Sequence, residues 1–210
     1  MEQDLFYLNE KFNILMNVEQ EDKSRFKNII SWAGEMMELS VKEKTSREIV
    51  PKRGQIWTCH FGENVGCEVN KTRPCVILQN NLGNTKGASS IVVPITKREE
   101  RLQTHVTLDE SDLMYVENSI MGTVITEQIR FVSKARLGRK IGILSDEAMI
   151  RIESALGIAL DLNLATKRII AEFEKAIELA LANASISDEM KKSIQQSIWN
   201  TLNHPLTLTA

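Results

Sequence analysis

The stretch TRPCVILQNN, residues 72–81, joins a short apolar segment to a polar turn. Its four consecutive apolar residues, Cys75 to Leu78, predict a buried strand that ends at the polar residues behind it. Because proline has no backbone N–H, Pro74 is expected at the first position of that strand. Arg73 is then held at a strand end beside a loop, where its guanidinium can bind a phosphate through two hydrogen bonds.

Around this stretch, from Ile49 to Leu144, the sequence is rich in Val, Ile and Thr and its apolar segments are short. Gly, Asn and Pro separate the segments, which is a pattern typical of a small β-barrel. Gly83–Gly87 is predicted to be a loop or hairpin turn, and Lys97–Gln103 an exposed loop. The strands are expected near residues 54–60, 74–80, 89–95, 104–108, 119–126 and 128–132.

Helices are expected on both sides of the strands. Apolar residues recur at helical spacing over residues 3–18 and 24–43, and again over residues 165–182. A helix beginning at Ser145 has acidic residues in its first turn, where the helix dipole favours them. The last helix is expected to be capped by Ser187 and ended by Pro205.

The expected fold class is therefore α+β, a small SH3-like barrel with added N-terminal and C-terminal helices. The expected parts are a helical extension, a barrel domain and a second helical extension, at residues 1–48, 49–163 and 164–210.

Charge is distributed unevenly along the 210 residues, although the net charge is only −2. Residues 1–48 carry 7 basic and 10 acidic side chains, residues 49–145 carry 13 and 9, and residues 146–210 carry 6 and 9. The central part is thus basic and both ends are acidic. A modest basic excess favours contact with a phosphate backbone without establishing it.

Composition excludes several classes of protein. No apolar run approaches the roughly 18 residues of a membrane span, and the acidic N-terminus lacks a signal-peptide core, so a cytoplasmic location is expected. The cysteines Cys59, Cys67 and Cys75 are odd in number and form no C-x-x-C pair, which favours reduced thiols. Cys59, His60 and Cys67 could make a metal site only with a further ligand, so we expect no metal and no cofactor.

Six segments carry a resemblance to a known family. They are KRGQIW at 52–57, GCE at 66–68, RP at 73–74, IVVPIT at 91–96, THVTLD at 104–109 and EQIR at 127–130. In this order and spacing, residues 50 to 162 resemble the MazF/PemK family of type II toxin–antitoxin endoribonuclease toxins. The resemblance implies a small MazF/PemK/CcdB-like barrel, a homodimer, and a cognate antitoxin that lays an acidic segment along the toxin's groove. Nucleic-acid binding, to RNA and also to DNA, belongs to the same expectation.

The resemblance also implies a reaction and its residues. The family cleaves single-stranded RNA, including mRNA, selectively and without metal, and leaves 2′,3′-cyclic phosphate and 5′-hydroxyl ends. Arg73 and Thr96 correspond to its catalytic pair. Because a guanidinium stays protonated in proteins, Arg73 is expected to stabilise phosphate charge, with protonation of the leaving group as a second possible role, rather than to act as a base. Glu68, His105 and Glu127 are the candidates for proton transfer, and the sequence does not choose among them.

RNA contacts are predicted for Arg53, Asn80, Asn81 and Gln128, because amide and guanidinium groups can read the edges of single-stranded bases. Relatives commonly carry a glycine pair where this chain has Asn70-Lys71, which predicts a stiffer and more positive loop before Arg73. The spacing ahead of Glu127 also departs from the family pattern.

Other functions compete with the nuclease. One alternative is a catalytically silent barrel module that binds RNA or a protein partner, and another is a toxin that acts on a gyrase-type enzyme. The helical ends allow three interpretations: a structural sleeve, an extended dimer interface, or an acidic cover over the basic groove in place of an antitoxin. If the cover exists, deleting residues 1–48 raises nuclease activity.

Overall fold

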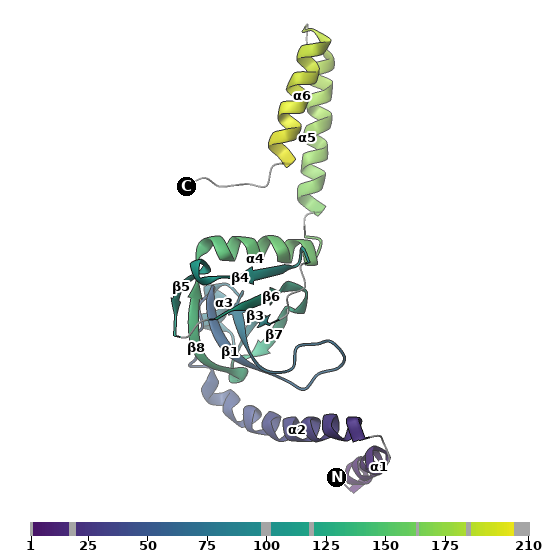
Figure 1. Ribbon diagram of the computed structural model, residues 1–210, viewed down its shortest axis with the longest axis vertical. Coiled ribbons are helices and arrows are strands. Elements are labelled where there is room, and N and C mark those ends of the chain that lie inside the picture. The colour runs from purple at the N-terminus through teal and green to yellow at the C-terminus, as the bar shows by residue number, and fades with distance from the viewer. Residues whose placement is uncertain are drawn as a thin grey trace. The chain divides into compact units, whose positions relative to one another are not determined.

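The computed structural model describes residues 2–16, 20–97, 102–117, 120–162, 164–183 and 186–203. The chain divides into two compact units, Met1–Ala159 and Leu160–Ala210. The first unit holds all the described strands, and the second is a pair of helices (Figure 1).

One curled antiparallel sheet forms the centre of the first unit (Figure 1). Its eight strands are β1 (Gln55–Gly62), β2 (Lys71–Ile77), β3 (Ser89–Thr96), β4 (His105–Leu108), β5 (Leu113–Val116), β6 (Gly122–Ile125), β7 (Arg130–Ser133) and β8 (Leu137–Leu144). They follow one another in space as β4-β6-β3-β2-β1-β8-β5, and β7 pairs with β3. The predicted α+β fold with a small barrel-like sheet is confirmed.

An apolar cluster lies on each face of the sheet. Neighbouring residues of a strand point to opposite faces and therefore enter different clusters. Val76 and Val93 point into one apolar cluster, and Cys75 and Val92 into the other. Helix α4 (Asp146–Ala159) covers the first cluster with Ala148, Met149, Ile152 and Ala155. The helix begins after Ser145, whose hydroxyl accepts a hydrogen bond from the Ala148 amide at 3.2 Å, as the sequence predicts.

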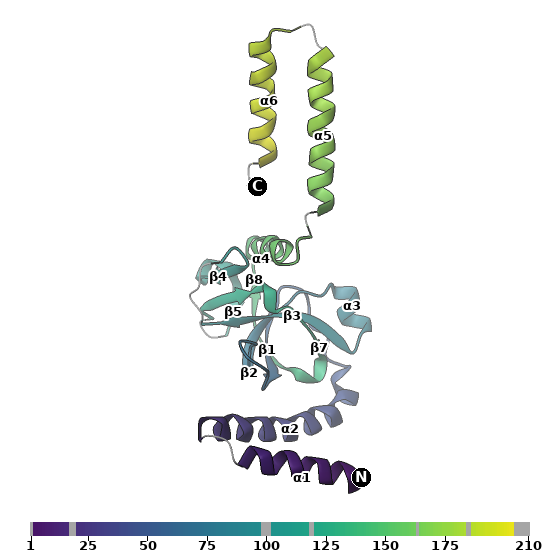
Figure 2. The same ribbon diagram turned by 90° about the vertical axis from the view of Figure 1, so that its right-hand side faces the viewer.

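The N-terminal helices are α1 (Glu2–Met16) and α2 (Gln20–Ser46), which contact each other and are drawn one below the other in Figure 2. Helix α2 packs against the short 3₁₀ turn η3 (Lys134–Arg136), which precedes β8. It runs further in both directions than the predicted 24–43, and the charged residues after Val41 continue it to Ser46.

The predicted turn at Gly83–Gly87 is wrong. Helix α3 (Asn81–Lys86) occupies most of it, and Asn80 caps the helix by accepting a hydrogen bond from the Gly83 amide at 2.8 Å. Its buried residue Asn84 receives a hydrogen bond from the Ser90 hydroxyl at 2.8 Å. The ammonium of the buried Lys134 donates to the Asn84 carbonyl oxygen at 2.6 Å, and burial lowers the pKa of that lysine. Tertiary contacts thus override the turn-forming sequence.

Two further expectations on the strands fail. Strands β5 and β8 were not expected within the β-rich region, and β2 begins at Lys71 rather than at Pro74. Pro74 pairs with Thr58 of β1, whereas the pairing of β2 with β3 begins one residue later, at Cys75. Proline is tolerated there because that part of β2 is paired on one side only.

The second unit consists of α5 (Leu164–Asn183) and α6 (Asp188–Asn203), which form an antiparallel hairpin (Figure 2). The Ser187 hydroxyl accepts a hydrogen bond from the Met190 amide at 3.3 Å, which confirms the predicted cap. Pro205 lies outside the described residues. Across the part of the chain that the structure describes, no helix is long and apolar enough to cross a membrane.

Candidate active site

An open cleft of about 490 Å³ lies where β2 begins and β3 ends. It is lined by Gly66, Cys67, Glu68, Val69, Asn70, Arg73, Thr96, Lys97, Ile125 and Gln128. Four of the nine residues that the sequence marked for function are therefore gathered in one cavity. They come from three places: the loop between β1 and β2, the facing ends of β2 and β3, and the 3₁₀ turn η2 (Thr126–Gln128).

Arg73 and Thr96 line the same cleft from two neighbouring strands. Strands β2 and β3 pair Cys75 with Pro94, and Arg73 and Thr96 each lie two residues beyond that pair, where the ladder of the two strands has ended. Residues two apart in a strand share a face, so both side chains belong to the side on which Cys75 is buried. The sheet therefore presents one guanidinium and one hydroxyl to the same cleft.

The Arg73 side chain is exposed, and its Nε donates a hydrogen bond to the Asn70 carbonyl oxygen at 3.3 Å. Among the residues that the structure describes, no carboxylate forms an ion pair with it. The guanidinium is thus oriented by the backbone while its charge still faces the cleft. Lys97, also exposed, adds a second cation to the same lining.

Gln128 fastens the loop of residues 63–70 to the sheet. Its side-chain Oε1 accepts a hydrogen bond from the Val69 amide at 2.7 Å, and its Nε2 donates to the Cys67 carbonyl oxygen at 3.0 Å. Within the loop, the Asn64 amide group donates to the Val69 carbonyl oxygen at 2.8 Å. The loop therefore has a defined shape beside Arg73, and both polar ends of Gln128 are used to hold it.

Glu68 is the one proton-transfer candidate that lines the cleft. One of its oxygens lies 2.7 Å from the Arg130 guanidinium, and the Glu68 side chain remains 51% exposed. The same guanidinium lies 5.9 Å from the centre of the Phe61 ring, which limits where it can move. Arg130 thus positions the carboxylate of Glu68 without removing it from solvent.

His105 and Glu127 pair with each other instead of lining the cleft. The His105 Nε2 lies 2.7 Å from the Glu127 carboxylate, and the His105 side chain is only 3% exposed. Burial by itself would raise the pKa of Glu127. Hydrogen bonds from its own backbone amide, from His105 and from Thr104 outweigh that effect and lower the pKa. Their roles in proton transfer stay predictions.

Asn80 and Asn81 lie beyond the other end of β2, about 25 Å along the chain from Arg73 at strand spacing, and Arg53 lies beside Asn81. The Arg53 amide donates to the Asn81 side chain at 2.9 Å, and its guanidinium contacts the Leu78 carbonyl and Glu153 of α4. Asn80 is the cap of α3. The structure gives these residues structural partners outside the cleft, and their RNA contacts stay predictions.

Lys97 and Cys67 also line the cleft, although the sequence predicts no catalytic or RNA-binding role for either. Lys97 directly follows Thr96, and this position at a strand end beside a basic loop was the available signal. All three cysteines are free thiols; Cys67 is exposed, and Cys59 and Cys75 are buried. A hydrogen bond with Cys59 and burial raise the pKa of the Cys75 thiol. Among the described residues, no group of three or more His, Cys, Asp and Glu side chains could hold a metal ion.

Comparison with known proteins places the chain in a family. Residues 52–160 match the family described as PemK-like, MazF-like toxin of type II toxin–antitoxin system, and this is about half of the chain. The chain is 34% identical over 116 residues to Endoribonuclease EndoA of Bacillus subtilis (strain 168), across 97% of that protein and 54% of this chain. The chain belongs to the PemK-like, MazF-like toxin family. The resemblance that the sequence motifs indicated is confirmed.

Solved structures similar to the chain carry related names. One is an endoribonuclease from Mycobacterial species, with a TM-score of 0.45 and 26% identity over 54% of this chain and 93% of that one. Another is MazF from Deinococcus radiodurans, with a TM-score of 0.48 and 20% identity over 54% of this chain and 99% of that one. Because both TM-scores lie below 0.5, the assignment to the family rests on the sequence matches.

Proposed function

We propose that the protein is an endoribonuclease that cleaves single-stranded RNA selectively and without a metal ion. The observation that carries the proposal is the shared cleft of Arg73, Thr96 and Glu68, which combines a cation, a hydroxyl and a carboxylate. The name of the relative, Endoribonuclease EndoA, supports the same activity.

The chemistry requires three tasks of these groups. The 2′-hydroxyl of RNA attacks its neighbouring phosphorus and gives up its proton, and Glu68 is the proposed acceptor because it lines the cleft. Arg73 stabilises the negative charge that grows on the non-bridging oxygens. Thr96 donates a hydrogen bond to the same phosphate. As the P–O5′ bond breaks, the 5′-oxygen takes up a proton from water and Glu68 returns its proton to the solvent, which leaves a 2′,3′-cyclic phosphate and a 5′-hydroxyl.

Selectivity is proposed to come from groups next to this triad. Asn70 and Gln128 present amide groups at the rim of the cleft, and Lys97 presents a charge for an adjacent phosphate. Gln128 already holds the loop through both ends of its amide, so it can read a base only by exchanging one of these hydrogen bonds.

The proposed partners are the RNA substrate, a cognate antitoxin and a second copy of the chain. One structure similar to this chain is an endoribonuclease in complex with its cognate antitoxin, from Mycobacterial species. The basic middle of the sequence is suited to an acidic antitoxin segment. We expect the enzyme to act in the cytoplasm, where mRNA is present.

The test is cleavage of a mixed-sequence RNA in excess EDTA, with identification of the new ends. Wild-type protein is expected to release 5′-hydroxyl products. Arg73→Ala is expected to slow cleavage by about 10²–10³-fold, the usual effect of removing one group that stabilises a developing oxyanion. Arg139→Ala is the matched control, since this arginine is 67% exposed and pairs with Glu117 outside the cleft. Cleavage that needs magnesium, or binding of RNA without cleavage, would contradict the proposal.

A further inference from the structure

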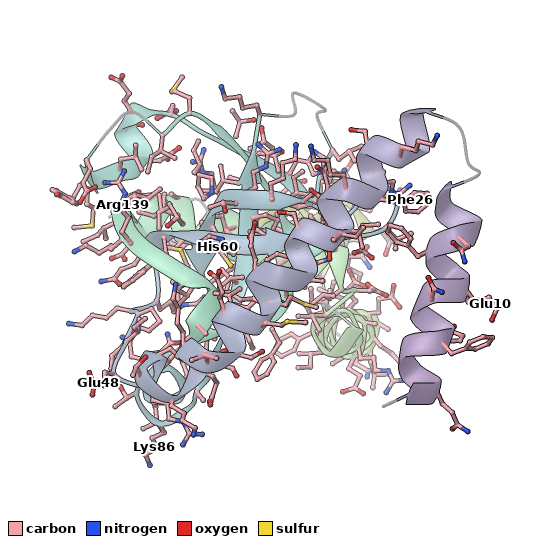
Figure 3. All side chains as sticks on the ribbon, turned by 90° about the horizontal axis from the view of Figure 1, so that it is seen from below. Glu10, Phe26, Glu48, His60, Lys86 and Arg139 are labelled. Atoms are coloured by element: carbon pink, nitrogen blue, oxygen red, sulfur yellow. The ribbon has the colours of Figure 1, made fainter. Side chains whose placement is uncertain are left out.

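The N-terminal helix α2 touches the barrel where the loop of the cleft begins. Figure 3 shows α2 crossing the face of the barrel that carries His60. Trp32 of α2 is only 9% exposed, although most of its helix faces solvent. Its indole lies directly on Gly62, the last residue of β1, so that a methyl group on Gly62 would overlap the Trp32 atoms Cε2 and Cζ2. This close approach requires glycine.

Arg136 connects the same tryptophan to the end of β1. The Arg136 guanidinium lies 5.2 Å from the centre of the Trp32 ring. Its Nη1 also donates to the carbonyl oxygens of His60 and Phe61, at 3.1 and 3.3 Å. Trp32 and Arg136 together fix the backbone that enters the loop 63–70.

Constraints on that loop continue up to the cleft. At its entry, the Asn64 side chain donates to the Phe61 carbonyl oxygen at 3.2 Å and to the Val69 carbonyl oxygen at 2.8 Å. At its exit, Lys71 has a φ of 66°, a left-handed backbone that a lysine adopts at a cost of about 1 kcal/mol. Such a backbone persists only where the surroundings hold it, so the loop depends on its anchors.

Helix α2 lies outside the segment that matches the family. The match begins at residue 52, whereas α2 ends at Ser46. Helix α2 contributes no residue to the lining of the cleft among the described residues. The contact of Trp32 with Gly62 is a route by which α2 can act on the loop of the cleft.

We propose that Trp32 is a positioning residue of the cleft: it presses on Gly62 and stacks with Arg136, and so holds loop 63–70 in the shape that presents Glu68 beside Arg73. The consequence for RNA cleavage rests on the proposed function. Without Trp32 the loop samples open conformations, and RNA that binds the ordered form must restore it. Such a penalty raises KM by the inverse of the fraction of molecules whose loop remains ordered, and leaves kcat nearly unchanged at saturation.

The test measures amide hydrogen exchange in the loop together with the kinetics. Trp32→Phe keeps an aromatic ring in place but lacks the atoms that contact Gly62, whereas Trp32→Ala removes the ring. Exchange at Val69 and Asn64 is expected to accelerate about tenfold in Trp32→Phe, and further in Trp32→Ala, while amides of β2 and β3 stay protected. In Trp32→Ala, KM is expected to rise about tenfold, which corresponds to an ordered loop in about a tenth of the molecules, with kcat within about twofold of wild type; Trp32→Phe should give a smaller rise. Met37→Ala, on the same helix but 72% exposed, is the control and should change neither.

The outcomes separate the two proposals. Unchanged loop exchange in a folded Trp32→Phe or Trp32→Ala protein would overturn the positioning role. So would a loss of kcat without a change of KM, because that is the signature of a smaller folded fraction. If wild-type protein does not cleave RNA, the proposed function fails, and the exchange data still decide whether Trp32 holds the loop. If Trp32→Ala does not fold, the graded change in Trp32→Phe gives the answer.

Discussion

Replacing Gln128 tests how firmly the loop of the cleft is held. Gln128→Ala removes the acceptor of the Val69 amide and the donor to the Cys67 carbonyl oxygen. Val69 is 8% exposed, so its unpaired N–H costs about 1–3 kcal/mol. Cys67 is exposed, so water replaces the second hydrogen bond at little cost. The closed loop is expected to lose about 2 kcal/mol.

A loss of about 2 kcal/mol corresponds to a roughly 30-fold larger population of the open loop, since 1.4 kcal/mol is a factor of ten. Native-state hydrogen exchange should therefore accelerate about 30-fold at Val69. Gln128→Glu keeps an acceptor for the Val69 amide and should retain most of the protection. Gln79→Ala removes a glutamine that hydrogen-bonds Ser89 instead, and should leave the loop unchanged. Equal exchange at Val69 in all four proteins would refute the reasoning.

Three further outcomes are expected. Lys134→Met removes a hydrogen bond to Asn84, which destabilises the fold, but it also removes the cost of burying an amine. Because these two contributions oppose each other, the free energy of unfolding at pH 7 should change by less than about 1 kcal/mol. Burial lowers the pKa of Lys134, so the unfolded chain binds more protons than the folded protein at alkaline pH. The free energy of unfolding of wild type should therefore rise relative to that of Lys134→Met as pH rises towards about 10. A constant difference between the urea midpoints of the two proteins across this pH range would contradict this. The pKa of Glu127 is lowered in the folded protein, so wild type should be more stable than Glu127→Gln above about pH 4.3. This difference in stability should disappear as pH falls through the pKa of the folded protein. Equal urea midpoints of the two proteins from pH 2 to 6 would exclude this effect. Lys71→Gly should raise the free energy of unfolding by about 0.5 kcal/mol, as relief of a left-handed φ exceeds the added freedom of the unfolded chain; a lower urea midpoint would count against this.

Much of the barrel could be predicted because its strands carry their own signals. The apolar run that ends in Ile77 and Leu78 and the IVVPIT segment at 91–96 are buried on both faces, so composition alone marks them. Strand β8 escaped prediction because Gly138, Arg139 and Gly142 are poor strand formers, and its pairing with β1 and β5 makes it a strand.

Helix α3 could not be predicted because its own residues favour a turn and only distant contacts favour the helix. Gly83, Asn84 and Gly87 are turn residues in isolation, and the contacts that favour a helix come from Ser90 and Lys134. Lys134 lies 50 residues along the chain from its partner, so no local pattern reports the contact.

The candidate site also has one part that the sequence predicts and one part that it does not. Arg73 and Thr96 could be placed by motif, because each stands at the end of a recognisable strand. The anchors of the loop could not be placed, because Gln128 hydrogen-bonds backbone atoms about sixty residues away and Trp32 contacts a glycine that has no side chain to reveal the pairing. Hydrogen bonds to backbone atoms leave no signature in residue type.

The central claim is that Arg73 and Thr96 act on one phosphate group. The most direct measurement is a double-mutant cycle of RNA cleavage rates under single-turnover conditions, with Arg73→Ala, Thr96→Val and both changes together. Two groups that stabilise the same transition state are coupled, so the double variant should lose less than the product of the single losses. Losses that multiply independently, or a Thr96→Val protein that cleaves at the wild-type rate, would contradict the account.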